Sequence, residues 1–175
     1  TTYEKGNKLE TRMGEFKEVD LLAIVINFVD ILGHSRSESN ILQEMVPDES
    51  AYRKAVCSWL ENAWLLNVLE EISHWGRTVF LTSDHGSTRV TKPVQIKGDR
   101  QTSTGIRFKY GQNIKMPQKS GITIPNPEKY LLPKHDLNTN YLIAKSGNFL
   151  IYPNEYHKFA NHYNNSFQHG GISLE

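Results

Sequence analysis

The sequence has a single cysteine, Cys57, among its 175 residues, so neither an internal disulfide nor a cysteine-rich zinc cluster can form. It has no apolar run close to the roughly 20 residues that a transmembrane helix needs, and its first ten residues are polar and charged. It also has no excess of charge of one sign, with 20 basic residues, 19 acidic residues and a formal net charge of +1. These absences argue against membrane proteins, disulfide-rich secreted domains and polycations that coat nucleic acid. We therefore expect a cytoplasmic protein.

The first half of the chain has the pattern of a strand, a helix and a second strand. Residues 21–29 and 78–83 are short apolar runs rich in β-branched side chains, which is typical of strands buried on both faces. Between them, residues 51–75 carry apolar side chains at helical spacing, after a helix-start signal at 47–50 and before Gly76. This order predicts an α/β fold with a mostly parallel sheet sandwiched by helices.

The second half has a different composition. Residues 87–135 are dominated by Gly, Pro, Lys, Ser and Thr and include a basic stretch, which favours an insertion rich in loops and hairpins over a helix. Residues 141–152 predict a pair of strands joined by a tight turn at Lys145–Asn148.

Metal-ligating residue types follow both predicted strands. Asp30 and His34 stand four residues apart after the first, Asp84 and His85 are adjacent after the second, and His169 lies in a glycine-rich turn. Imidazole and carboxylate are the groups that bind zinc when thiolates are missing. Loops at the carboxyl ends of parallel strands are also where α/β sheets place their sites. The pattern favours a metal site at this edge of the sheet.

Each of these residues also has a simpler interpretation. An aspartate at a strand end often caps the next helix, which is the preferred explanation for Asp30 taken alone. A single histidine in a loop is usually a surface residue. Capping does not require a histidine after each strand-end aspartate, however, so the joint arrangement favours a metal site over capping.

The motifs that carry these residues resemble those of the PglZ domain of the alkaline phosphatase superfamily. They are Val25–Asp30 with Gly33–His34, then Ser83–Gly86, then Phe167–Ser173. The likeness is strongest to the effector domain of PorX-type response regulators, where Gly98–Thr104 and Tyr152–Asn154 also have counterparts. It covers nearly the whole chain from about Val19.

The resemblance implies a binuclear zinc site, with manganese also compatible with the ligands. Asp30, His34 and His169 would bind one ion, and Asp84 and His85 the other. The family's Thr or Ser nucleophile and a further Asp ligand belong to an upstream motif that has no match here. We therefore expect residues 1–175 to be the C-terminal portion of a PglZ domain, inactive without its nucleophile-bearing part.

The implied function is a metal-dependent phosphodiesterase or phosphatase acting on nucleotide-type esters such as oligonucleotides. It would be the output domain of a response regulator, with a receiver domain in the same chain and a homodimer as further expectations. Arg100 and Arg107 are the predicted phosphate contacts, because a guanidinium can grip phosphate with two hydrogen bonds. The alternatives are a non-catalytic metal-binding regulatory or dimerisation module and a relative with sulfatase or phosphomutase chemistry.

Overall fold

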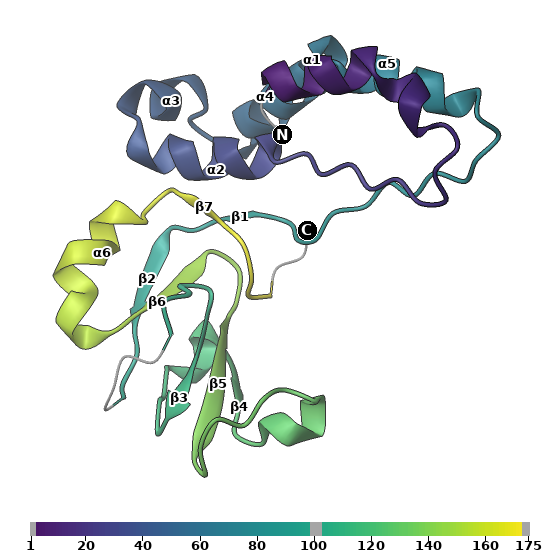
Figure 1. The fold of residues 1–175 in the computed structure, drawn as a ribbon. Helices are drawn as coiled ribbons and strands as arrows, with labels where there is room; N and C mark the ends of the chain where they lie inside the picture. Colours follow the sequence, from purple (N-terminus) through teal and green to yellow (C-terminus); the bar gives the residue numbers. More distant parts are fainter. Residues whose placement is uncertain (1–2, 99–102, 173–175) are drawn as a thin grey trace. The chain divides into compact units, whose positions relative to one another are not determined.

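A computed structural model of the protein describes residues 3–98 and 103–172 (Figure 1). The chain divides into two units, Thr1–Thr82 and Ser83–Glu175. The first is helical and the second consists mainly of short strands, so the expected α/β class is confirmed as a mixed α/β fold. The expected mostly parallel sheet is not confirmed, because the sheets are small and mixed.

The helical unit is built around one tryptophan. Its elements are α1 (Tyr3–Thr11), the 3-10 helix η1 (Met13–Phe16), α2 (Phe28–Glu38), α3 (Asn40–Met45), α4 (Glu49–Asn62) and α5 (Leu65–Ser73). Trp64, 2% exposed, packs in a core with Met13, Leu65 and Val68. Gly6 of α1 lies against it so closely that an added Cβ would fall 1.8 Å from the indole nitrogen. Only glycine therefore fits there.

The predicted helix over residues 51–75 forms as two helices. It begins as expected, since the Asp48 carboxylate accepts a hydrogen bond from the backbone N–H of Ala51 at 2.8 Å and caps α4. It breaks at Ala63, whose backbone is extended and ends α4. The next residue, Trp64, enters the core. Gly76, with φ +65°, supplies the left-handed turn expected after the helical segment.

The two predicted buried strands are not strands in this structure. Residues 20–27 and 77–83 contain none, and Phe28 and Val29 already belong to α2. Alternate side chains of the first segment pack on the helical core, and the second exposes Phe80 (88%) and Leu81 (82%). Arg77 ties the starts of both together by donating to the carbonyl oxygens of Lys17 and Val19, each at 2.7 Å. The prediction was wrong because no backbone ladder pairs either segment with a neighbour among the described residues.

The described residues of the second unit form three small sheets. Its strands are β1 (Thr88–Arg89), β2 (Lys92–Gln95), β3 (Phe108–Gln112), β4 (Gly121–Ile124), β5 (Thr139–Ala144), β6 (Asn148–Ile151) and β7 (Phe167–Gln168). β1 pairs with β7 antiparallel, β2 with β6 parallel, and β5 lies between β3 and β4 in an antiparallel sheet. Its helical elements are the 3-10 helices η2 (Gln118–Ser120), η3 (Pro127–Tyr130) and η4 (Pro153–Glu155), followed by α6 (Tyr156–His162). The described part of residues 87–135 has no α-helix, as predicted.

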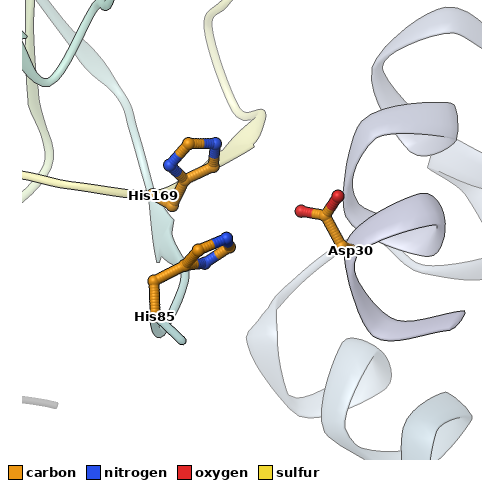
Figure 2. Close-up of side chains that lie close together, drawn as sticks. All are labelled: Asp30, His85 and His169. Carbon is orange, nitrogen blue, oxygen red and sulfur yellow. The ribbon is translucent and has the colours of Figure 1, made fainter. Parts of the chain in front are cut away.

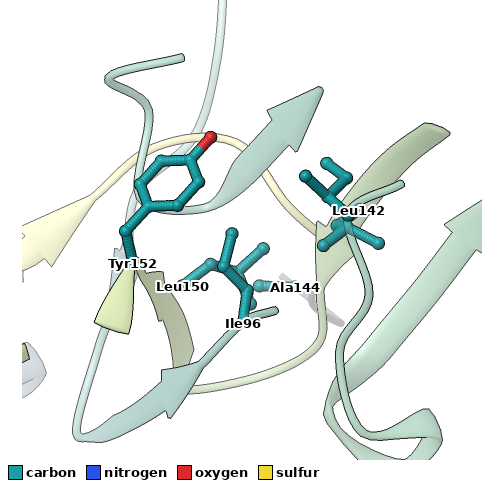
Figure 3. Close-up of a cluster of buried hydrophobic side chains, with 6 residues drawn as sticks. Ile96, Leu142, Ala144, Leu150 and Tyr152 are labelled. Carbon is teal, nitrogen blue, oxygen red and sulfur yellow. The ribbon is translucent and has the colours of Figure 1, made fainter. Parts of the chain in front are cut away.

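Among its described residues, the second unit has two apolar clusters. The first is shown in Figure 3 and consists of fully or almost fully buried side chains, namely Ile96, Ile114, Leu142, Ala144, Leu150 and Tyr152. The second joins Val90, Phe149 and Ile151 to Phe159 of α6 and to Tyr163, which directly follows that helix. Both clusters use residues from β6, which therefore lies at the centre of the unit.

Both strands predicted within residues 141–152 are present, but they do not pair with each other as predicted. β5 and β6 form, and the turn between them is closed by a hydrogen bond from the N–H of Asn148 to the carbonyl of Lys145 at 3.1 Å. The strands then diverge, because β5 pairs with β3 and β4 whereas β6 pairs with β2.

Within the described residues, no helix combines the length and apolar character needed to span a bilayer.

Candidate metal centre

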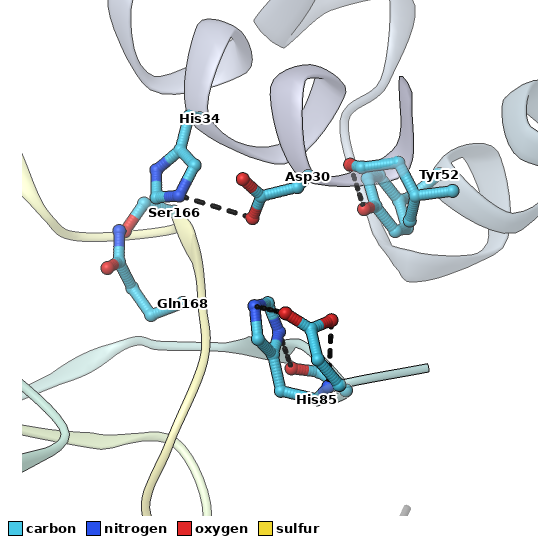
Figure 4. A network of polar contacts seen from close by, with 9 residues as sticks. Asp30, His34, Tyr52, His85, Ser166 and Gln168 are labelled. Carbon is cyan, nitrogen blue, oxygen red and sulfur yellow. Dashed lines mark hydrogen bonds and ion pairs between the residues drawn. The ribbon is translucent and has the colours of Figure 1, made fainter. Parts of the chain in front are cut away.

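Asp30 and His34 form a pair on one face of α2. Four residues is about one helical turn, which brings the His34 Nε2 to 3.4 Å from a carboxylate oxygen of Asp30 (Figure 4). Both side chains are about half exposed. Asp30 lies in the first turn of the helix rather than at a strand end, and the hydroxyl of Tyr52 fixes that turn by donating to the carbonyl of Val29 at 2.8 Å. The pair presents one oxygen and one nitrogen donor on the same side of the helix.

In the second unit, Asp84 and His85 form a tight turn. The Asp84 carboxylate accepts from the backbone N–H of His85 at 3.1 Å, and its other oxygen lies 3.6 Å from His85 Nε2. The Nδ1 of His85 is 3.2 Å from the carbonyl oxygen of Gly86. A hydrogen bond there keeps the proton on Nδ1 and leaves the Nε2 lone pair for a metal ion. The Asp84 carboxylate is 88% exposed, so it is accessible to an ion.

His169 lies beside His85 although the two are distant in the sequence. The two rings are stacked (Figure 2). Their centroids are 4.3 Å apart and the ring planes make an angle of 24°. The antiparallel pairing of β1 with β7, with Thr88 opposite Gln168, brings the two histidines together. Two imidazoles with a carboxylate next to one of them are a donor set suited to zinc, so these residues fit the ion that the resemblance implies.

The turn that follows His169 is formed by two glycines with φ +82° each, Gly170 and Gly171. Beyond it, Ile172 exchanges backbone hydrogen bonds with the end of β5. Its N–H donates to the carbonyl of Ala144 at 2.8 Å, and its carbonyl accepts from the N–H of Ser146 at 2.9 Å. His169 is thus held between a strand pair before it and a backbone anchor after it.

The structure gives Arg107 a different place from the one predicted. Its side chain is 1% exposed, and its guanidinium donates to the carbonyl oxygens of Gly170, Ser146 and Asn148. A phosphate contact needs an accessible guanidinium, so burial argues against that role. The other predicted phosphate contact, Arg100, lies outside the described residues.

Lys109 is a buried cation that the sequence reasoning did not single out. It is 3% exposed and its amine donates to the carbonyl of Ser103 at 3.1 Å, with the Tyr152 ring 4.4 Å away. Burial lowers the pKa of Lys109 to about 8, against a smaller opposing effect of Glu155. The signal was the i, i+2 spacing of Arg107 and Lys109, which places both side chains on one face of the extended segment that leads into β3, although charged residues usually mark the outer face.

No curated protein matches this sequence. The sequence does match one family along almost its whole length, over residues 4–175, and that family is described as the BREX system PglZ alkaline phosphatase-like domain. Because the match covers almost the whole chain, we conclude that the chain belongs to the PglZ family of alkaline phosphatase-like domains.

Proposed function

We propose that this chain carries the metal-binding residues of a zinc-dependent phosphoric ester hydrolase. The observation that carries the proposal is the stacking of His85 and His169 at 4.3 Å, next to the exposed carboxylate of Asp84. The β1–β7 pairing brings these two exposed imidazoles face to face, although neither belongs to the buried apolar clusters of the unit. A shared task as metal ligands accounts for the arrangement, and the alkaline phosphatase-like family supplies the reaction class.

Zinc ions bound by these residues would polarise phosphoryl oxygens and stabilise the charge on the attacking and leaving groups. The five ligands are those of the family resemblance, Asp30, His34, Asp84, His85 and His169, and two ions are the proposed number. The chain's own contribution is to orient them. Gly86 fixes the tautomer of His85 through its carbonyl, and the first turn of α2 is tied to Tyr52. Manganese suits the same ligands.

The proposed substrates are phosphodiesters of the nucleotide type, as the likeness to PorX-type effector domains implies. The exposed lysines of the basic stretch over residues 97–119, which are Lys97, Lys115 and Lys119, support an anionic substrate. Such charges raise the local concentration of an anion without fixing its identity. The same likeness suggests that the domain is the output of a response regulator, with a receiver domain in the full-length protein.

The test is hydrolysis of bis(p-nitrophenyl) phosphate by the full-length protein with added zinc. We expect metal-dependent turnover that falls at least about a hundredfold in Asp84→Ala and His169→Ala, since direct ligands are lost. His162→Ala is the matched control, because His162 is an exposed histidine of the same unit outside the ligand set. It should keep native activity.

Monoester and sulfate ester substrates assayed in parallel separate the diesterase from its relatives. A preference for the sulfate ester would assign sulfatase chemistry instead. If the zinc-loaded native protein hydrolyses none of these esters faster than Asp84→Ala does, the enzymatic proposal fails and the domain is a non-catalytic metal-binding module.

A further inference from the structure

Arg107 joins two segments of the second unit that are distant in the sequence. From the residue before β3, its Nε donates to the carbonyl of Gly170 at 3.0 Å, and its Nη1 donates to the carbonyls of Ser146 and Asn148. Gly170 directly follows His169, whereas Ser146 and Asn148 belong to the turn between β5 and β6. One buried guanidinium therefore connects the backbone beside His169 to the central strands.

The glycine turn is shaped around this side chain. A Cβ added to Gly171 would lie 2.6 Å from Nη2 of Arg107 and 2.8 Å from the carbonyl oxygen of Ala144. The positive φ of Gly171 would strain any other residue as well. The turn after His169 can therefore keep this backbone conformation beside the Arg107 guanidinium only with a glycine at position 171.

The chemistry of the contact requires arginine. The N–H groups of a guanidinium point outward in a fixed plane, so Nε and Nη1 can donate to carbonyls on different segments at the same time. A lysine amine would donate from one point at the end of a flexible stem and could not span both segments. Burying a cation without such acceptors would lower the stability of the folded protein. The carbonyl acceptors around the Arg107 guanidinium therefore favour a specific role for this residue.

We propose that Arg107 is a positioning residue that orients the His169 imidazole for metal binding. This inference rests on the proposed function only in taking His169 as a metal ligand. Arg107 acts through the carbonyl of Gly170, much as hydrogen-bonded neighbours of metal ligands fix their orientation elsewhere. It replaces the predicted contact of Arg107 with substrate phosphate.

The first test measures zinc affinity by competition with a chromogenic chelator, without any turnover. Arg107→Lys should bind zinc about 10- to 100-fold more weakly than the native protein, as loss of such an outer partner commonly does. The double variant Arg107→Lys/His169→Ala should bind no more weakly than His169→Ala alone. Lys109→Met, which removes the buried cation two residues after Arg107, should keep native affinity. Native affinity in Arg107→Lys, or additive losses in the double variant, would overturn the proposal.

The second test needs no metal. In the metal-free protein, the Cε1–H signal of His169, assigned with His169→Ala, should shift or broaden in Arg107→Lys while that of His162 stays unchanged. If Arg107→Lys does not fold, Gly171→Ala approaches the same contact from the other side and should change the same signal. An unchanged His169 signal in a folded variant would contradict a positioning role. Failure of the native protein to bind zinc would instead refute the proposed function, and the His169 signal would still decide the role of Arg107.

Discussion

The two units hold their candidate ligands by different means. Asp30 and His34 are one turn apart on α2, so their 3.4 Å contact follows from the helix alone. His85 and His169 meet only because β1 pairs with β7 and the turn after His169 is anchored. The first pair needs local structure and the second needs the packing of a whole unit. Core substitutions in the second unit should therefore damage its ligand pair, and those in the first should damage stability alone.

The substitution Phe167→Ala is the strongest test of whether the ligand pair of the second unit depends on packing. Phe167, in β7 two residues before His169, is 3% exposed, so its removal leaves a cavity and should cost about 3–5 kcal/mol of the free energy of unfolding. Denaturant unfolding followed by near-UV circular dichroism and by the His85 and His169 signals would measure it. Phe108→Ala is the matched control, because Phe108 is 43% exposed and should cost about 1 kcal/mol or less. Equal losses of the free energy of unfolding in the two variants would show that the packing of β7 does not hold His85 and His169 together.

The pH dependence of stability tests whether the amine of Lys109 is shielded from water in the second unit. Because burial lowers its pKa to about 8 from the ordinary 10.5, the unfolded chain holds this proton more tightly than the folded protein does. Stability should therefore rise with pH through this window, by about 2 kcal/mol between pH 7.5 and 9.5 from this group alone. Urea unfolding of the native protein and of Lys109→Met at both pH values isolates the effect. An identical pH dependence in the two proteins would mean that water reaches the amine.

Asp48→Ala tests the first unit, where stability comes from local signals. The Asp48 carboxylate caps α4 through the N–H of Ala51, and losing such a cap costs about 1 kcal/mol. We expect the thermal midpoint to fall while the zinc affinity of the protein is unchanged, since the Asp30–His34 contact is set within α2 and the hydrogen bond from Tyr52 to Val29 does not involve the Asp48 side chain. Asp48→Asn, which retains a side-chain acceptor, should restore most of the stability. A loss of zinc affinity in Asp48→Ala would show that the first ligand pair also depends on distant packing.

The features that the sequence predicted correctly are local ones. The start of α4 at Asp48, the turn at Gly76 and the strands β5 and β6 each depend on a few neighbouring residues. The stacking of His85 on His169 was not predictable from spacing, because it requires the β1–β7 register. The family resemblance supplied the ligand set without that contact.

The errors arise where a neighbouring element decides the outcome. Arg107 was predicted to contact phosphate and Lys109 was not singled out, yet both are buried and donate to backbone carbonyls. β5 and β6 were expected to pair with each other and instead pair with strands distant in the sequence. Composition and alternation do not encode which of two faces is covered, so only the three-dimensional fold could correct these points.

The smallest expected effect concerns the apolar segment at 77–83. Phe80 is 88% exposed, so Phe80→Ala should change the free energy of unfolding by no more than about 0.5 kcal/mol. A phenylalanine in a strand buried on both faces, as the sequence pattern predicted, would instead cost about 3–5 kcal/mol. Leu22→Ala, in the other apolar segment, is the comparison, because Leu22 packs on the helical core and should cost more than Phe80 does. A large loss in Phe80→Ala would mean that this segment is buried in a sheet in solution, because an exposed ring has no packing to lose.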